Sequence, residues 1–390
     1  MKQKPEHILF SVAWYPNQSG KLCSPFVKGH AEAISQYCKL SVLGVFSSAQ
    51  HKHIHIERRQ VNSQLSEYLV YTPEFRVTDA FGWKLVAGIY YYIAYLLGLA
   101  KILKHEGPIS GIHVNVLTRA GLIPMMIKIL FKKPYIISEH WSRYYSSEKF
   151  KPSGLHYRLT KAIVKQAAAV YVASGPLKAA MQKAGLSNQH YHGFRNVVDT
   201  SLFKPQSPPS HRVKHFTTLA FFKDEVKNHS GILRVLARLQ KDGLAFHYTF
   251  IGDGQDLERI KALSASYGLD DKLVFKGRLN AAEIAAELQQ TDVSILFSNY
   301  ESQPVSIIES LACGTPVVAT KVGDIPKMIP EACGELIPPQ DEEALYQCMV
   351  KIISGQSRYA REKCLEAARK YSYSKVGKAF ADSYKDYGLA

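Results

Sequence analysis

The chain has 390 residues, a length that suits two ordinary domains better than one. Hydrophobic residues make up 46% and charged residues 21%, which excludes a globally disordered chain. The formal net charge of +16 favours an anionic partner, which is nucleic acid, an acidic membrane surface or a substrate that carries phosphate.

Segments typical of buried strands alternate with helical segments through the first half of the chain. Such an alternation predicts a parallel sheet that is covered by helices on both faces. The strand-like runs lie at residues 7–14, 112–116, 135–140 and 167–174, and helical patterns occupy residues 26–37, 120–130 and 177–184.

Residues 85–100, LVAGIYYYIAYLLGLA, form the longest apolar stretch, with Lys84 and Lys101 on either side. A membrane-spanning helix needs about 20 apolar residues, and this stretch is shorter and contains four tyrosines. We therefore expect either a buried helix or a helix that rests in a membrane interface.

Residues 201–213, SLFKPQSPPSHRV, interrupt the alternation with three prolines and read as a linker. After them the alternation restarts. The sequence predicts an α/β protein with two doubly wound, Rossmann-like domains, at residues 1–200 and 211–370, and a helix at 371–390 that packs back on the first domain. Ligands bind at the carboxyl ends of the strands in such folds, so we expect a site in a cleft between the two domains.

The most informative stretch is NYESQPVSIIESLACGTPVVAT, residues 299–320. Pro304 suits the first turn of a helix, and the helix ends near Gly314. Glu301 then lies in the loop after a strand, and Glu309 lies on the helix.

The helix starts at Pro304, which has no N–H, and the backbone N–H groups that follow it, around Val305, Ser306 and Ile307, can bind a diphosphate. Glu309 can accept hydrogen bonds from the two hydroxyls of a ribose, and Glu301 can hold the hydroxyls of a sugar.

The same stretch resembles the E-x7-E signature of family 4 of the retaining glycosyltransferases, together with its usual S-L-A-C-G-x-P-V-V-A-T continuation. The resemblance extends over nearly the whole chain. It implies the GT-B fold and transfer of a sugar from a nucleoside diphosphate sugar, with the anomeric configuration retained.

Two further segments of the second half resemble the family. KNHSG, residues 227–231, is similar to its helix start, whose lysine, here Lys227, meets the donor diphosphate. The arginine usual about five residues earlier is replaced by Phe222, which leaves Lys223 as the candidate second cation. GRLN, residues 277–280, resembles the loop against which the donor base stacks, and makes Arg278 a candidate contact.

The first half carries the resemblance in residues 14–34 and 136–141. The segment that includes Gly20 matches the family's loop near the donor phosphates, where glycine permits a close backbone approach. IISEHW places His140 where the family has a histidine close to the transferred sugar.

We therefore predict a glycosyltransferase with Glu301, His140 and Lys227 in catalytic roles, which transfers a sugar to a hydroxyl of a glycan or lipid-linked acceptor in surface polysaccharide synthesis. No D-x-D motif follows a strand, and we expect neither a metal nor a cofactor. Three alternatives remain open, namely a sugar-nucleotide epimerase of the same fold, a non-catalytic nucleic-acid binder and a sugar-binding protein without catalysis.

Six cysteines without a C-x-x-C pair favour a reducing compartment, and the opening residues lack the apolar core of a signal peptide. We expect a cytoplasmic protein on the inner face of a membrane, with an anionic membrane surface as a partner and no nucleic acid.

Overall fold

The computed structural model describes residues 6–20, 24–74, 81–117, 119–145, 150, 153–206, 213–357 and 359–390. The chain forms two compact units, the first from Met1–Arg195 with Tyr373–Ala390 and the second from Asn196–Ser372. The second unit begins at 196 rather than at 211, because Val198 and Phe203 are buried in its core and the Val198 N–H donates to the Tyr371 carbonyl at 2.9 Å.

The first unit contains an eight-stranded sheet in the order β3-β4-β2-β1-β5-β6-β7-β8. Neighbouring strands are parallel except for β3 and β4, an antiparallel pair that the sequence did not predict. Its strands are β1 (His7–Val12), β2 (Lys39–Ser48), β3 (His55–Gln60), β4 (Leu65–Pro73), β5 (Gly111–Asn115), β6 (Tyr135–Glu139), β7 (Ala169–Val172) and β8 (Tyr191–Gly193).

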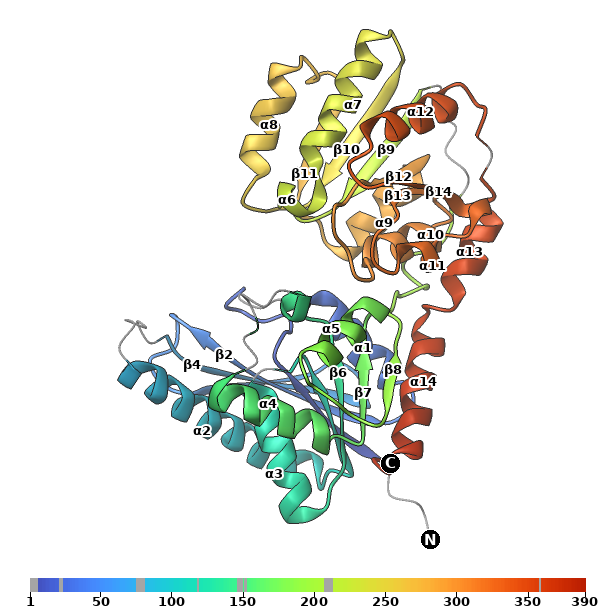
Figure 1. Ribbon diagram of the computed structural model, residues 1–390. Helices are drawn as coiled ribbons and strands as arrows, with labels where there is room; N and C mark the ends of the chain where they lie inside the picture. The colour runs from blue at the N-terminus through green and yellow to red at the C-terminus, as the bar shows by residue number, and fades with distance from the viewer. Residues whose placement is uncertain are drawn as a thin grey trace. The chain divides into compact units, whose positions relative to one another are not determined.

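Helices cover both faces of this sheet. The strand order runs from β1 through β2 to β4 on one side and from β1 through β5 to β8 on the other, and right-handed crossovers in opposite directions place their helices on opposite faces. The helices α2, α3 and α4 lie on one face, and α1 and α14 lie on the other (Figure 1). The helical elements are α1 (Pro25–Ile34), α2 (Phe81–Glu106), η1 (Arg119–Gly121), α3 (Leu122–Phe131), η2 (Ser142–Tyr145), α4 (Gly154–Gln166), α5 (Gly175–Lys183) and α14 (Tyr373–Asp386).

The second unit contains a six-stranded, fully parallel sheet in the order β11-β10-β9-β12-β13-β14 (Figure 1). Its strands are β9 (Lys214–Leu219), β10 (Phe246–Ile251), β11 (Leu273–Gly277), β12 (Val293–Leu296), β13 (Val317–Thr320) and β14 (Gly334–Ile337). Its helical elements are α6 (Asp224–Lys227), α7 (His229–Lys241), α8 (Leu257–Ser266), α9 (Ala281–Gln290), α10 (Val305–Ala312), α11 (Ile325–Met328), η3 (Glu331–Cys333), α12 (Glu342–Ile353) and α13 (Arg361–Arg369).

Both sheets confirm the predicted fold class of two doubly wound α/β domains. Strands such as β1, β12 and β13 are buried along their whole length, since a parallel sheet with helices on both faces leaves them no solvated side. Each unit has its own hydrophobic core between sheet and helices.

The expectation for residues 85–100 was wrong in length. Helix α2 continues through Lys101 to Glu106, and its segment Leu85–Glu106 has 22 residues and a mean hydropathy of 1.6, enough by length and composition to cross a membrane. The prediction that this stretch is too short came from stopping at Lys101, although Ile102 and Leu103 extend the apolar pattern.

Candidate active site

Lys227 and Glu301 lie together at the carboxyl edge of the second unit's sheet. Lys227 is the last residue of α6, which follows β9, and Glu301 lies in the loop after β12. The Lys227 ammonium is 2.5 Å from a Glu301 carboxylate oxygen, and the same oxygen accepts a hydrogen bond from the Ser298 hydroxyl at 2.8 Å. The two side chains are only 19% and 9% exposed, so water screens this pair weakly.

Backbone contacts hold the Glu301 loop in place. The Asn299 N–H donates to the Val226 carbonyl at 2.8 Å, and its side-chain amide donates to the Glu225 carbonyl at 3.0 Å, which ties the loop to α6. On the other side the loop meets Gly323, where an added Cβ would lie 2.2 Å from the Glu301 carbonyl oxygen. Gly323 also has a φ of +57°, so any larger residue here would push the Glu301 backbone away.

Glu309 lies on α10, half-buried, and its carboxylate has no hydrogen-bond or salt-bridge partner among the residues that the structure describes. Burial without a partner raises the pKa of Glu309 from 4.5 to about 7. An unpaired carboxylate with a raised pKa is typical of a site that awaits a ligand with hydroxyl or N–H donors.

Helix α10 begins beside the Glu301 loop. Pro304 is its N-cap residue and is buried, and Val305 and Ser306 form its first turn and are half-buried. In the described part of the chain no side chain caps this helix, so its first N–H groups keep their capacity to bind an anion.

Phe222, which stands where the family has an arginine, is a core residue. Its ring is 1% exposed and stacks on His229 at a centroid distance of 4.3 Å and an interplanar angle of 9°. Both ring nitrogens of His229 are buried and lack a hydrogen-bond partner within the described ranges, and burial lowers the pKa of His229 to about 4. Apart from the replaced arginine, no sequence pattern predicted this stacked pair.

Lys223 and Arg278 lie in loops of the second unit, and Gly20 lies in a loop of the first unit. Lys223 precedes α6 and forms a 3.6 Å salt bridge with the exposed Glu225 rather than with Glu301. Arg278 is exposed in the loop after β11, at the same carboxyl edge. Gly20 is exposed in the loop after β1 of the first unit with a φ of +67°, and the next residues of that loop, 21–23, lie outside the described residues.

His140 follows β6 at the carboxyl edge of the first unit's sheet. Its ring packs against Phe26, Phe194 and His30, with centroid distances of 4.7, 4.8 and 5.8 Å. Its Nε2 atom is buried and has no hydrogen-bond partner in the described part of the chain. Burial, followed by the nearby histidines, holds the pKa of His140 well below its usual value, so the ring is neutral at pH 7.

Glu139 positions the loop that carries His140, a role that the sequence analysis missed. Its carboxylate accepts hydrogen bonds from the backbone N–H groups of His140, Trp141 and Leu117, each at 2.9 Å. Burial raises the pKa of Glu139 despite these bonds. The only available signal was its place directly before His140 in IISEHW, since acidic residues at strand ends commonly accept backbone N–H bonds.

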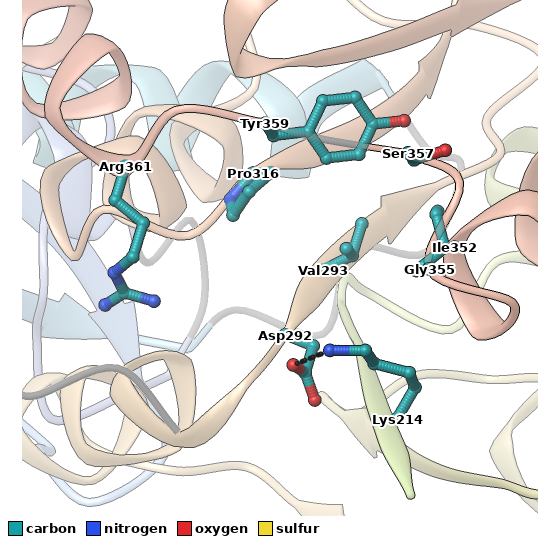
Figure 2. A pocket seen from close by; sticks show the side chains of 9 residues that line it. All are labelled: Lys214, Asp292, Val293, Pro316, Ile352, Gly355, Ser357, Tyr359 and Arg361. Atoms are coloured by element: carbon teal, nitrogen blue, oxygen red, sulfur yellow. Dashed lines mark hydrogen bonds and ion pairs between the residues drawn. The ribbon is translucent and has the colours of Figure 1, made fainter. Parts of the chain in front are cut away.

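A cavity of about 280 Å³ lies at the opposite edge of the second sheet. Lys214 and Asp292 form a 2.8 Å salt bridge beside it, and Arg361 lines another side (Figure 2). Because Lys214 begins β9 and Asp292 precedes β12, this cavity is at the amino ends of the strands. Ligands bind at the carboxyl ends in doubly wound folds, so the cavity is separate from the candidate site.

The second unit thus brings Lys227, Glu301, Glu309 and the start of α10 to one edge, and the first unit carries His140 and Gly20. Residues 204–371 match the family model described as "Glycosyl transferases group 1". The protein WcaL of Escherichia coli, named as a glycosyltransferase of colanic acid biosynthesis, is 28% identical over 174 residues, and the match covers 43% of each chain. The chain therefore spans less than half the length of this relative.

Two solved structures are similar over nearly the whole chain. Sucrose-phosphate synthase from Thermosynechococcus elongatus aligns with a TM-score of 0.76 at 17% identity and covers 98% of both chains. HepE from Anabaena, solved in complex with UDP-glucose, aligns with a TM-score of 0.68 at 15% identity and covers 97% of this chain and 99% of its own. These likenesses show that the chain has the GT-B fold.

Proposed function

Because residues 204–371 belong to the glycosyl transferases group 1 family, we propose that this chain transfers a sugar from a nucleoside diphosphate sugar to a hydroxyl of a glycan or lipid-linked acceptor. The observation that carries the proposal is the half-buried carboxylate of Glu309, which has no partner among the described residues and lies eight residues after Glu301, the partner of Lys227. The UDP-glucose complex of HepE, a protein of the same fold, supports a donor of this class.

Each group of the site has a place in donor binding. Glu309 accepts hydrogen bonds from the ribose hydroxyls, which stabilise its charged form and offset the cost of its burial. The diphosphate meets the N–H groups at the start of α10 and the Lys227 ammonium. Glu301 exchanges part of its contact with Lys227 for hydroxyls of the sugar.

In the reaction the bond from the anomeric carbon to the diphosphate oxygen breaks, and the acceptor oxygen bonds to the same carbon. The leaving phosphate oxygen takes the acceptor proton, so no protein base is needed. Negative charge grows on the leaving diphosphate, where Lys227 and α10 stabilise it in the transition state more than in the ground state. We assign a retaining outcome to this front-face path, with neutral His140 beside the sugar and no metal ion.

The cysteines support the proposed location, and one relative supports the proposed acceptor. The five described cysteines are buried free thiols, which suits a reducing compartment, and the proposal places the enzyme in the cytoplasm. The biosynthetic name of WcaL supports an acceptor that belongs to a surface polysaccharide.

A thermal-shift screen against UDP, GDP and ADP sugars tests the proposal. A donor at about 100 times its Kd should stabilise the folded chain by about 2.7 kcal/mol. The Glu309→Ala variant should lose that shift, while Glu362→Ala, at an exposed glutamate of α13, should keep it. Absence of a shift with every donor, together with no transfer or hydrolysis, would refute the proposed function.

A further inference from the structure

The outer face of α2 is an apolar stripe. Leu85, Ile89, Ile93, Leu96 and Leu97 follow one another at helical spacing, and each is between 45% and 57% exposed. Side chains of this kind normally face the core, and one alone on a surface needs no explanation, whereas a continuous stripe marks an interaction site.

The inner face of the same helix shows that α2 lies along the sheet. Ala94, Tyr95, Leu99 and Ile102 are buried in the first unit's core, and an added Cβ at Gly98 would lie 2.6 Å from Leu43. A helix fastened in this way cannot cross a bilayer, although its length and composition would allow it. Only its outer face is free for a partner.

Helix α3 continues the exposed apolar surface. Met126, Ile129, Leu130 and Phe131 are between 45% and 68% exposed. The two helices lie on the same face of the sheet (Figure 1), and the Arg119 guanidinium, just before α3, lies 5.9 Å from the centre of the Tyr91 ring of α2. The outer faces of α2 and α3 therefore form one surface, here called the α2–α3 surface.

The charges at the rim of the α2–α3 surface are positive. Lys101 and Lys104 are exposed near the end of α2, and Lys132 and Lys133 are exposed directly after α3. The acidic residue of α2, Glu106, is held by Lys39 at 3.0 Å and Arg58 at 2.9 Å, and α3 contains no acidic residue. A second copy would bring the same lysines of both chains into one interface, which like-charge repulsion disfavours.

A small cavity lies at the edge of this surface, beside Ile129. It has a volume of about 250 Å³ and is lined by Lys128, Lys132, Pro134 and Gln166. The Lys128 ammonium already donates to the Gln166 carbonyl, which fixes its position. Two lysines next to an apolar helix face suit a phosphate whose attached chains continue into hydrocarbon.

We propose that the α2–α3 surface docks on an anionic phospholipid bilayer, with its apolar side chains in the interface and a lipid phosphate between Lys128 and Lys132. Since α2 and α3 both end at the amino edge of the first sheet, the lipid phosphate lies at the edge opposite to the one that carries His140 and Gly20. The inference does not depend on the chemistry of the enzyme, because no residue of the surface belongs to the candidate site.

Vesicle sedimentation of the full chain tests this docking. The vesicles are phosphatidylcholine with about 30% phosphatidylglycerol, compared with phosphatidylcholine alone, at low and high salt. The charge variant Lys132→Glu with Lys133→Glu should weaken binding at least about thirtyfold. Two lysines at about 1 kcal/mol each amount to about 2 kcal/mol, and every 1.4 kcal/mol is about tenfold in affinity. The apolar variant Ile93→Gln with Leu130→Gln should weaken it about tenfold or more.

The matched charge control is Lys241→Glu with Lys385→Glu, at exposed lysines of α7 and α14. It changes the net charge equally and should bind as the wild type does. Wild-type protein that stays in the supernatant at low salt would overturn the proposal. So would equal binding of all variants, or a wild-type dimer that the apolar variant dissociates without any vesicle binding. Donor thermal shifts of both surface variants should equal the wild type, which separates this test from that of the enzyme.

Discussion

The substitution Glu309→Gln should make the protein more stable and a poorer enzyme. Burial raises the pKa of Glu309 from 4.5 to about 7, so between these pH values the unfolded chain loses a proton that the folded chain keeps. Stability therefore falls as pH rises through this window and reaches its lower level above pH 7. Glutamine keeps the shape and carries no charge, so it removes the penalty.

The size of the effect follows from the pKa difference. Linkage gives a penalty of about 1 kcal/mol at pH 5 and about 3 kcal/mol at pH 8, as upper values because the side chain keeps some contact with water. For a unit of this size, about 3 kcal/mol corresponds to a rise in Tm of roughly 5 to 10 °C. The donor should meanwhile bind about thirtyfold more weakly, because an amide accepts fewer ribose hydrogen bonds than a carboxylate.

Melting curves of wild type and Glu309→Gln at pH 5 and pH 8 check the first part, and donor titrations check the second. Glu362→Gln, at an exposed position of α13, is the matched control and should leave both unchanged. If the gain in Tm is absent, or is the same at both pH values, the conclusion that Glu309 is an unpaired, buried carboxylate with a raised pKa is refuted. Unchanged donor affinity would remove Glu309 from the ribose contact.

The other predictions concern the remaining site groups. Lys227→Ala should lower turnover by about 10²- to 10³-fold through lost charge stabilisation. It should also destabilise the fold, because Glu301 would keep a single hydrogen-bond partner among the described residues, Ser298; steady-state kinetics and melting curves measure both. Glu301→Gln should fold normally and transfer at least about tenfold more slowly, and an unchanged kcat/KM would contradict its role. His140→Ala should fold and lower kcat/KM, with unchanged transfer as the contrary result. Chelation with EDTA should leave turnover unchanged, and a loss that Mg²⁺ restores would show that a metal takes part.

The fold class was predictable because buried parallel strands read as continuous apolar runs, and their alternation with helices leaves few other architectures. The antiparallel strand β3 was not, since its residues His55–Gln60 are mostly polar and exposed and carry no apolar periodicity. The length of α2 was underestimated because Lys101, an exposed residue within the helix, was taken as its end.

The candidate site was predictable residue by residue only where a motif names it. Glu301, Glu309 and Lys227 came from such motifs, and no pattern showed that Lys227 and Glu301 would form a salt bridge. Phe222 looked like a missing cation, and only its stacking on His229 shows that the position belongs to the core. Such contacts join segments that are distant in the sequence, and one sequence alone does not show which distant segments meet in the fold.

The last helix, α14, has a consequence for how the protein is made. Tyr384 bonds through its hydroxyl to His113 Nδ1 at 2.7 Å, and Gly377 packs so closely that an added Cβ would lie 2.1 Å from the Ala33 carbonyl. The first unit to leave the ribosome therefore lacks one of its covering helices until the final residues are translated. The second unit, continuous from Asn196 to Ser372, can complete its core before that moment. A ribosome that stops early therefore releases a chain whose first sheet lacks a covering helix while its second unit is complete. For the same reason, a chimaera that exchanges the first unit between relatives has to exchange both ends of the chain.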